Sequence, residues 1–280
     1  MKLTMMVMIT FFSLFGMSES VLEAPNTPIA YDERIEIDVP ILMYHHITPD
    51  AENVENSMTI TPERFEEHIS SIYEEGYTPV FLEELIAYVE SGEQLPEKPI
   101  CITFDDGYTS NYEYAFPILN KYNAKANIAI IGTSIGASQY KNTENRIIPH
   151  FDMGQAKVME ASGVISIISH TYDMHQAEAF ESGDKIRKNA LKLLNETDEE
   201  YEIALRTDFE LMSQILKDEL GKGNQIMAYP YGKYSEQSNK ILKELGVKMT
   251  LATTVGTNKI QKGNSECLYN LHRYTIHENS

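Results

Sequence analysis

Short apolar runs recur along the chain, and segments with helical periodicity separate most of them. The runs lie at residues 40–44, 77–80, 99–104, 126–131, 164–169, 225–229, 247–253 and 271–276. Each run has the length of a buried strand rather than that of a helix. Strands that alternate with helices usually form a parallel sheet, so the pattern predicts an α/β fold.

Several of the intervening segments carry helix signals at both ends. A capping residue stands at the start and a glycine at the end of three of them, which run from Thr61 to Gly76, from Thr197 to Gly221 and from Ser235 to Gly246. Pro62 follows the first cap, and residues 197–200 form a capping box. These three segments are therefore predicted helices.

Polar residues follow the apolar runs at the points where predicted strands end. They are His45, Asp105, Asp106, His170 and Tyr231. An open sheet would scatter these side chains, whereas a closed barrel gathers the carboxyl ends of its strands around one mouth. The distribution of these residues favours a barrel that forms one domain.

The residue types at two of these strand ends are typical of a hydrolytic metal site. Asp105 and Asp106 follow one run, and His170 and His175 follow another. One carboxylate and two imidazoles give a divalent ion three protein ligands and leave a position for water, while the other carboxylate can act as a base. Residues five apart diverge by about 140° on a helix, so the histidines are predicted to act from a loop.

Three motifs resemble those of a known family. Thr103-Phe-Asp-Asp-Gly107, Ser169-His-Thr-Tyr-Asp-Met-His175 and Tyr229-Pro-Tyr-Gly232 are similar to the first three motifs of the polysaccharide deacetylases, the NodB-type carbohydrate esterases. The resemblance covers residues 39–280 and implies a single-domain, distorted (β/α)7 barrel of the TIM type. It also implies removal of N-acetyl groups from amino-sugar polymers with a bound divalent metal.

The resemblance assigns roles to individual residues. Asp105 resembles the catalytic base, and the metal triad is matched by Asp106, His170 and His175. The backbone N–H of Tyr231, directly after Pro230, matches the donor that stabilises the oxyanion. The mixed nitrogen and oxygen ligands suit Zn²⁺, which we expect, but also Co²⁺, Ni²⁺ or Mn²⁺.

The spacing of five between the histidines departs from the many members that have four. It resembles the branch that deacetylates poly-β-1,6-N-acetylglucosamine, in which the general acid comes from an N-terminal Tyr-His element. That element corresponds to Tyr44 and His45, so His45 is the candidate acid that protonates the departing amine. His46 and His272 remain alternatives.

A second departure concerns the arginine that usually stands two residues before the proline of the third motif. This chain has Ala228 there, so another group must orient Asp105. We hypothesise that Arg273, on the last predicted strand, supplies the charge from across the barrel mouth.

Aromatic residues near the motifs are candidates for substrate binding. Sugar rings stack their C–H faces on aromatic side chains, and the chain has 17 Tyr and no Trp. Tyr108, Tyr172 and Tyr231 flank the expected site beside Pro230. The polar residues 176–200 interrupt the strand and helix rhythm and are predicted to form a rim loop or short helix.

The N-terminal residues have a different character from the rest. Residues 1–20 resemble a secretory signal peptide, because Lys2 precedes a mostly apolar stretch and Ser18-Glu-Ser20 has the form of a cleavage site. The apolar part is shorter than the roughly 20 residues that span a bilayer, which argues against an uncleaved membrane anchor. Residues 21–38 read as a linker. Export would permit a disulfide between Cys101 and Cys267, but Cys101 lies within an apolar run and reads more simply as a buried apolar residue.

The expected protein is thus a secreted or cell-envelope hydrolase that acts on a β-linked N-acetylglucosamine polymer and has no stable membrane anchor. The formal net charge of −19 argues against a nucleic-acid partner. Two alternatives stay open: a catalytically silent glycan-binding barrel, for which Ala228 is the main support, and an O-acetyl esterase of the xylan type. The sequence does not indicate an oligomeric state.

Overall fold

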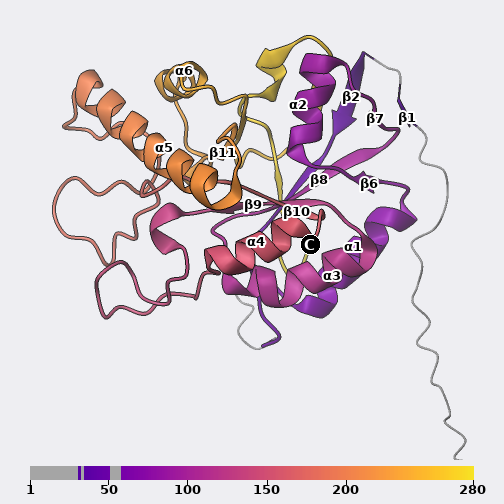
Figure 1. Ribbon diagram of the computed structural model, residues 1–280, viewed down its shortest axis with the longest axis horizontal. Coiled ribbons are helices and arrows are strands. Elements are labelled where there is room, and N and C mark those ends of the chain that lie inside the picture. Colours follow the sequence, from indigo (N-terminus) through magenta and orange to yellow (C-terminus); the bar gives the residue numbers. More distant parts are fainter. Residues whose placement is uncertain (1–30, 33–34, 51–57) are drawn as a thin grey trace, which may run out of the picture.

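The computed structural model describes residues 31–32, 35–50 and 58–280. The predicted signal peptide and most of the predicted linker lie outside these residues. A parallel sheet runs through the centre of the described part, with helices on its outer side (Figure 1). The carboxyl ends of its strands carry the polar residues that the motifs contain.

Seven strands form the main path of the sheet. In spatial order they are β12 (Met249–Leu251), β11 (Ile226–Ala228), β10 (Ile165–Ser169), β9 (Ala126–Ile130), β8 (Pro99–Phe104), β3 (Ile41–Tyr44) and β14 (Tyr274–Thr275), and β6 (Thr78–Pro79) pairs with β8 beside them. Each of the eight predicted runs therefore contains a strand. All these neighbours pair in parallel, as the βα alternation predicted.

The two ends of this sheet meet. Leu251 of β12 forms a parallel bridge with Leu271, just before β14, and the N–H of Ala252 donates to the carbonyl of Leu271 at 2.9 Å. The prediction of a distorted (β/α)7 barrel is confirmed. Closure brings the last strand beside the first ones, so residues near both ends of the sequence face one barrel mouth.

Six α-helices are described. They are α1 (Pro62–Glu74), α2 (Leu82–Ser91), α3 (Phe116–Tyr122), α4 (Met153–Ala161), α5 (Asp198–Leu220) and α6 (Glu236–Glu244). The three helices with predicted start signals are α1, α5 and α6, and each cap side chain accepts a hydrogen bond from the N–H three residues later. Among the described residues, no helix combines the length and apolar character that crossing a bilayer requires.

Shorter strands pair outside the main sheet. They are β1 (Tyr31–Asp32) with β7 (Leu95–Pro96), β2 (Glu36–Val39) with β13 (Asn258–Gln261), and β4 (His46–Ile47) with β5 (Thr59–Ile60). Strand β2 lies mostly within residues 21–38, so the reading of that segment as a linker is corrected at its C-terminal end. Ile37 and Val39 are buried between exposed acidic residues, and two apolar residues were too weak a signal for a strand.

The central strands β8, β9 and β10 are fully buried, and the ionisable side chains of the site follow where these strands end. Every residue of β8, β9 and β10 is buried, as expected for strands covered on both faces. The chain leaves these strands at Phe104 and Ser169, and the next residues are the polar ones. Cys101 is buried in β8, and both it and Cys267 are free, so the simpler reading of the cysteines is correct.

Candidate active site

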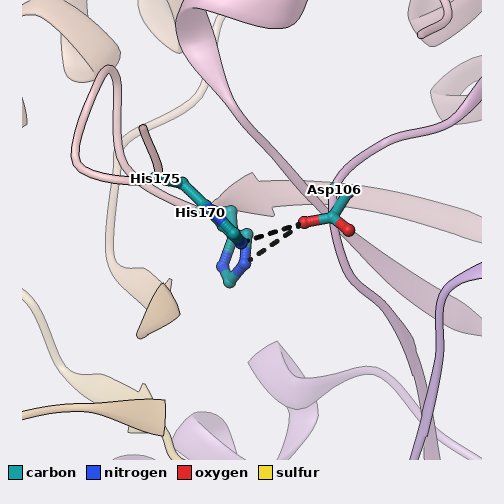
Figure 2. A group of neighbouring side chains, drawn as sticks. All are labelled: Asp106, His170 and His175. Atoms are coloured by element: carbon teal, nitrogen blue, oxygen red, sulfur yellow. Dashed lines mark ion pairs between the residues drawn. The ribbon is translucent and has the colours of Figure 1, made fainter. Parts of the chain in front are cut away.

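Asp106, His170 and His175 lie together at the barrel mouth (Figure 2). Nε2 of His170 is 3.6 Å and Nε2 of His175 is 3.5 Å from Oδ1 of Asp106. These three ligand atoms all lie within 4.8 Å of one another. The two histidines are on a loop rather than a helix, as their spacing predicted.

The chemistry of the three residues fits a divalent cation. Oδ1 of Asp106 is buried and has no hydrogen-bond partner among the described residues, although buried polar atoms are normally paired. Nδ1 of His170 donates to the carbonyl of Ala228 at 2.8 Å, which leaves the lone pair of Nε2 directed toward Asp106. Burial lowers the pKa of His170, so this imidazole is neutral and can act as a ligand.

The backbone at Asp106 turns sharply to present the carboxylate. Asp106 has a φ of 73° and Gly107 a φ of 78°, both in the left-handed region. A Cβ at position 107 would lie 2.8 Å from Cγ2 of Ile130 on the neighbouring strand β9. The glycine of the Asp-Asp-Gly motif is therefore required by this turn and by close packing on the sheet.

Asp105 pairs with Arg273 across the barrel. Nη1 and Nη2 of Arg273 donate to Oδ1 and Oδ2 of Asp105 at 2.7 and 2.8 Å, and Nε donates to the carbonyl of Ala252 at 2.8 Å. The side chain of Arg273 is 0% exposed. The hypothesised contact is thus present, and barrel closure explains it, because Arg273 directly precedes β14.

This pairing sets the ionisation of Asp105. Burial raises the pKa of the carboxyl, but the charge and hydrogen bonds of Arg273 and the charges of the His170 and His45 imidazoles together outweigh burial and hold the pKa well below its usual range. Asp105 is therefore ionised at neutral pH. Burial likewise raises the pKa of Asp106, and three neighbouring imidazoles, His175 foremost, bring it below its usual value.

The three candidate acids occupy different surroundings. The charge of His45 contributes to lowering the pKa of both Asp105 and Asp106, and its buried Nδ1 has no partner among the described residues. Nδ1 of His46 lies 2.9 Å from Oγ of Ser110, and burial lowers the pKa of His46. His272 is exposed.

His272 points away from the mouth. Its ring lies against Gly256, where a Cβ would come within 2.6 Å of Nδ1 of His272. Its neighbour Arg273 is buried and points into the barrel instead, as expected for successive residues in an extended chain. Of the three candidates, His45 is the one whose charge acts on the pKa of both carboxylates.

Two of the three predicted tyrosines lie beside the triad. The rings of Tyr231 and His175 are 4.7 Å apart, and Tyr231 is 57% exposed, so it can meet a ligand. Burial, and after it the charge of Asp106, raises the pKa of Tyr108 above its usual range. Pro230 is buried beneath the turn that carries Tyr231, whose φ is 55°.

Tyr172 has other contacts. Its ring covers Gly132, where a Cβ would lie 2.4 Å from Cδ2 of the tyrosine. Its N–H donates to Oδ1 of Asp208 at 2.9 Å. The structure therefore connects Tyr172 to the ligand loop and to α5 rather than to the triad itself.

Sequence reasoning missed His150 and Asp208. The ring of His150 lies 5.0 Å from that of Tyr108, in an irregular segment that offers no periodic signal. Asp208 did leave a signal: it falls on the helical stripe of Tyr201, Leu205 and Met212, where an apolar residue is expected, and it is 7% exposed. A carboxylate in that position indicates a polar partner outside the helix.

Comparisons with known proteins agree with the fold and the motifs. Residues 92–250 match the family model described as polysaccharide deacetylase. A Bacillus subtilis protein that carries the name polysaccharide deacetylase is 30% identical over 238 residues, which are 85% of this chain and 71% of that protein. The poly-β-1,6-N-acetyl-D-glucosamine N-deacetylase of Escherichia coli is 27% identical over 220 residues, 74% of this chain but 33% of that enzyme.

A solved structure gives the same result. The de-N-acetylase of Aggregatibacter actinomycetemcomitans superposes with a TM-score of 0.73 at 26% identity, covering 87% of this chain and 97% of that one. The likeness therefore extends over most of this chain and nearly all of the solved one. The chain belongs to the polysaccharide deacetylase family of hydrolases.

Proposed function

We propose that this protein is an exported, metal-dependent enzyme that hydrolyses the N-acetyl amide of a β-linked N-acetylglucosamine polymer and releases acetate. The observation that carries the proposal is that the two adjacent carboxylates, Asp105 and Asp106, have different partners. Asp106 converges with two histidines, while Asp105 is turned away from them and paired with Arg273. A metal ligand and a base are thereby available side by side.

Asp106, His170 and His175 would hold the metal. When bound, a divalent cation supplies Lewis acidity, which makes an amide carbonyl more electrophilic and a water more acidic. The mixed ligand set suits Zn²⁺, with Co²⁺, Ni²⁺ and Mn²⁺ as further candidates. The buried, unpaired oxygen of Asp106 supports this assignment.

The chain's own groups account for the proton transfers. Asp105 is kept ionised by Arg273 and accepts a proton from the attacking water. As the water oxygen bonds to the acetyl carbon, the N–H of Tyr231 donates to the oxygen that gains charge. His45 then gives a proton to the sugar nitrogen as the C–N bond breaks, which yields acetate and a free amine.

The substrate and the location are further parts of the proposal. The name of the Escherichia coli relative supports a β-1,6-linked polymer, although this chain spans only 33% of that enzyme. Exposed Tyr231, with Tyr108 beside it, is suited to contact a sugar ring, and Tyr172 is a third candidate. Secretion or attachment to the cell envelope is proposed from residues 1–20, which lie outside the described part.

Acetate release from β-1,6- and β-1,4-linked N-acetylglucosamine oligomers, and from acetylated xylan, tests the proposal. We expect release from the β-1,6 oligomers that stops with a chelator, returns with Zn²⁺ or Co²⁺, and is lost in Asp105→Asn. Asp218→Asn, the same change at an exposed position of α5, is the matched control. Failure of the wild-type protein to release acetate under all these conditions would contradict the proposal.

The catalytically silent glycan-binding barrel gives a different result in the same experiment. It would bind the oligomers without releasing acetate, in both the wild type and Asp105→Asn. Its main support was Ala228, and the pairing of Arg273 with Asp105 weakens that support, because a guanidinium reaches Asp105 from the residue just before β14.

A further inference from the structure

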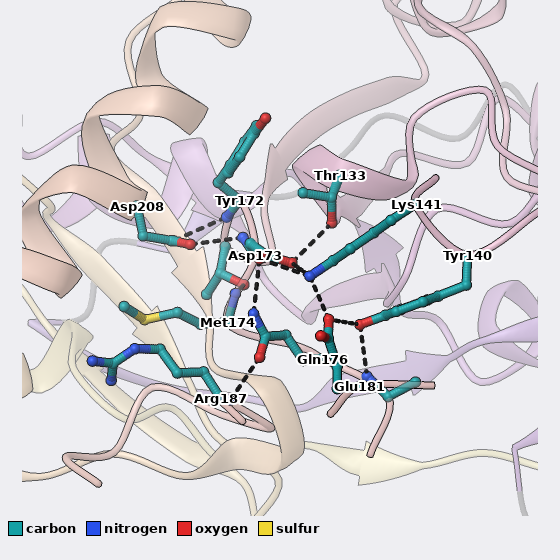
Figure 3. A network of polar contacts seen from close by, with 12 residues as sticks. Thr133, Tyr140, Lys141, Tyr172, Asp173, Met174, Gln176, Glu181, Arg187 and Asp208 are labelled. Carbon is teal, nitrogen blue, oxygen red and sulfur yellow. Dashed lines mark hydrogen bonds and ion pairs between the residues drawn. The ribbon is translucent and has the colours of Figure 1, made fainter. Parts of the chain in front are cut away.

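We propose that Asp208 on α5, assisted by Lys141, is a positioning residue that places His175 by holding the loop between the two histidines. The inference rests on the proposed metal site and adds residues that lie outside it. Figure 3 shows the contacts: the loop residues Tyr172 and Asp173 lie between the Asp208 carboxylate on one side and the Lys141 ammonium on the other.

The two histidines are fixed to different degrees. His170 directly follows β10, is 2% exposed, and its ring is bound to the carbonyl of Ala228. The ring of His175 instead packs against the rings of His170 and Tyr231, with centroids 5.1 and 4.7 Å away. The place of His175 thus depends on the path of the chain from residue 171 to residue 174.

That path needs support from outside. Thr171 has a φ of 73°, which is a rare conformation for a β-branched residue, so the loop does not follow a preferred backbone geometry. The spacing of five residues also prevents a helical turn from setting the positions of both imidazoles. Other parts of the fold must therefore hold the loop in place.

Asp208 holds the backbone of this loop. Its Oδ1 accepts the N–H of Tyr172 at 2.9 Å, and its Oδ2 accepts the N–H of Asp173 at 2.6 Å. Burial raises the pKa of Asp208 to about 6 despite these two bonds. Burying a carboxylate on the apolar stripe of a helix costs free energy of folding. Its presence there is explained if the two hydrogen bonds to the loop have a role beyond packing.

Lys141 holds the loop from the opposite side. Its Nζ lies 2.8 Å from the Asp173 carboxylate and 2.5 Å from Oε1 of Glu181. Nε2 of Gln176 donates to the same Asp173 carboxylate at 2.8 Å. Lys141, from the segment after β9, and Gln176, just beyond His175, thus both contact Asp173 of the loop between the histidines. Asp208 connects the same loop to α5.

Metal affinity tests the inference directly. The metal-free full chain is titrated with Zn²⁺ against a chelating dye, and its Co²⁺ complex is examined by visible absorption. In Asp208→Asn the amide keeps one acceptor and turns an NH₂ group toward the other backbone N–H. Because loss of a group that orients a ligand typically weakens metal binding about 10- to 100-fold, we expect that loss and an altered Co²⁺ spectrum.

Two further variants sharpen the experiment. Lys141→Met removes the outer contact, and we expect a smaller loss of affinity, because this pair is 27% and 31% exposed. In the double variant the loss should differ from the sum of the single losses, since both residues hold one loop. Asp218→Asn on the exposed face of α5 should bind both ions like the wild type.

Each outcome distinguishes the inference from the function on which it rests. If the wild type binds neither ion, the proposed metal site itself is wrong. If the wild type binds and Asp208→Asn binds equally well with the same Co²⁺ spectrum, the positioning role is refuted. If Asp208→Asn shows no cooperative thermal unfolding, Lys141→Met decides, and unchanged affinity there would overturn the inference.

Discussion

Replacing Arg273 with methionine would remove the guanidinium that pairs with Asp105 and leave an unbranched side chain in the same buried space. The two parallel hydrogen bonds, at 2.7 and 2.8 Å, would be lost together. Asp105 would keep its burial but lose its main opposing charge. The variant therefore isolates what the arginine contributes to the ionisation of the proposed base.

The expected loss of stability is large. Removing one partner of a buried ion pair costs about 3–5 kcal/mol, because the remaining charge stays buried without compensation. The side chains of Arg273 and Asp105 are 0% and 4% exposed, so solvent screening does not reduce this estimate. At about 2–4 °C per kcal/mol for a domain of this size, Tm should fall by roughly 6–20 °C.

The pH dependence follows from the direction of the pKa shift. In the wild type the folded pKa of Asp105 is depressed, so its contribution to stability is present above the unfolded value of about 3.9 and is lost as pH falls through the lower folded value. Without Arg273 the pKa rises. The base is then protonated at higher pH, and the acidic limb of kcat/KM moves upward.

Acetate release by the metal-loaded variant, measured across pH, gives the result. Arg206→Met is the matched control, because Arg206 pairs with Glu202 and Glu244, whose side chains are 47% and 46% exposed, and ion pairs at the surface contribute little to stability. Arg273→Lys, which keeps the charge but not the paired geometry, should be intermediate. Wild-type turnover with an unchanged acidic limb in Arg273→Met would refute the reasoning.

Other predictions concern single groups of the site. Asp105→Asn should bind Zn²⁺ normally and lose about 10²- to 10⁴-fold in turnover, whereas Asp106→Asn should lose the ion itself, as measured by dye competition. His45→Gln should retain Zn²⁺ and lose about 10²- to 10⁴-fold in turnover, and His46→Gln should turn over like the wild type; the reverse would exchange their roles. Gly107→Ala should destabilise the fold by more than about 1 kcal/mol in urea unfolding, because of the positive φ and the contact with β9.

The sequence was sufficient for elements whose signals are local. Apolar runs located the strands, and Thr61, Thr197 and Ser235 marked three helix starts, because a cap needs only the N–H groups that follow it. The pairing of β2 with β13 was missed. Its two strands are more than 200 residues apart, and one buried face of two residues carries little periodic information.

Of the two contacts that hold the site from a distance, the sequence indicated that of Arg273 but not that of Asp208. The Arg273 partner was anticipated because the family resemblance implies an arginine that pairs with Asp105, and the usual position for it holds Ala228. The position of Asp208 on the apolar stripe of α5 indicated a polar partner but did not identify it. Its bonds reach backbone N–H groups 36 and 35 residues away, and a backbone donor leaves no mark on the sequence.

The backbone at the barrel mouth explains why the chemistry gathers there. Asp106, Thr171 and Tyr231 follow β8, β10 and β11, and all three have positive φ, at 73°, 73° and 55°. Each such residue costs about 1–3 kcal/mol, with aspartate at the low end and threonine at the high end, and the conformation persists only where the surroundings hold it. Buried strands on one side and polar contacts such as those of Asp208 on the other provide that constraint. The strained turns thereby place the Asp106 carboxylate beside the two imidazoles, and the Tyr231 ring against that of His175, at the barrel mouth.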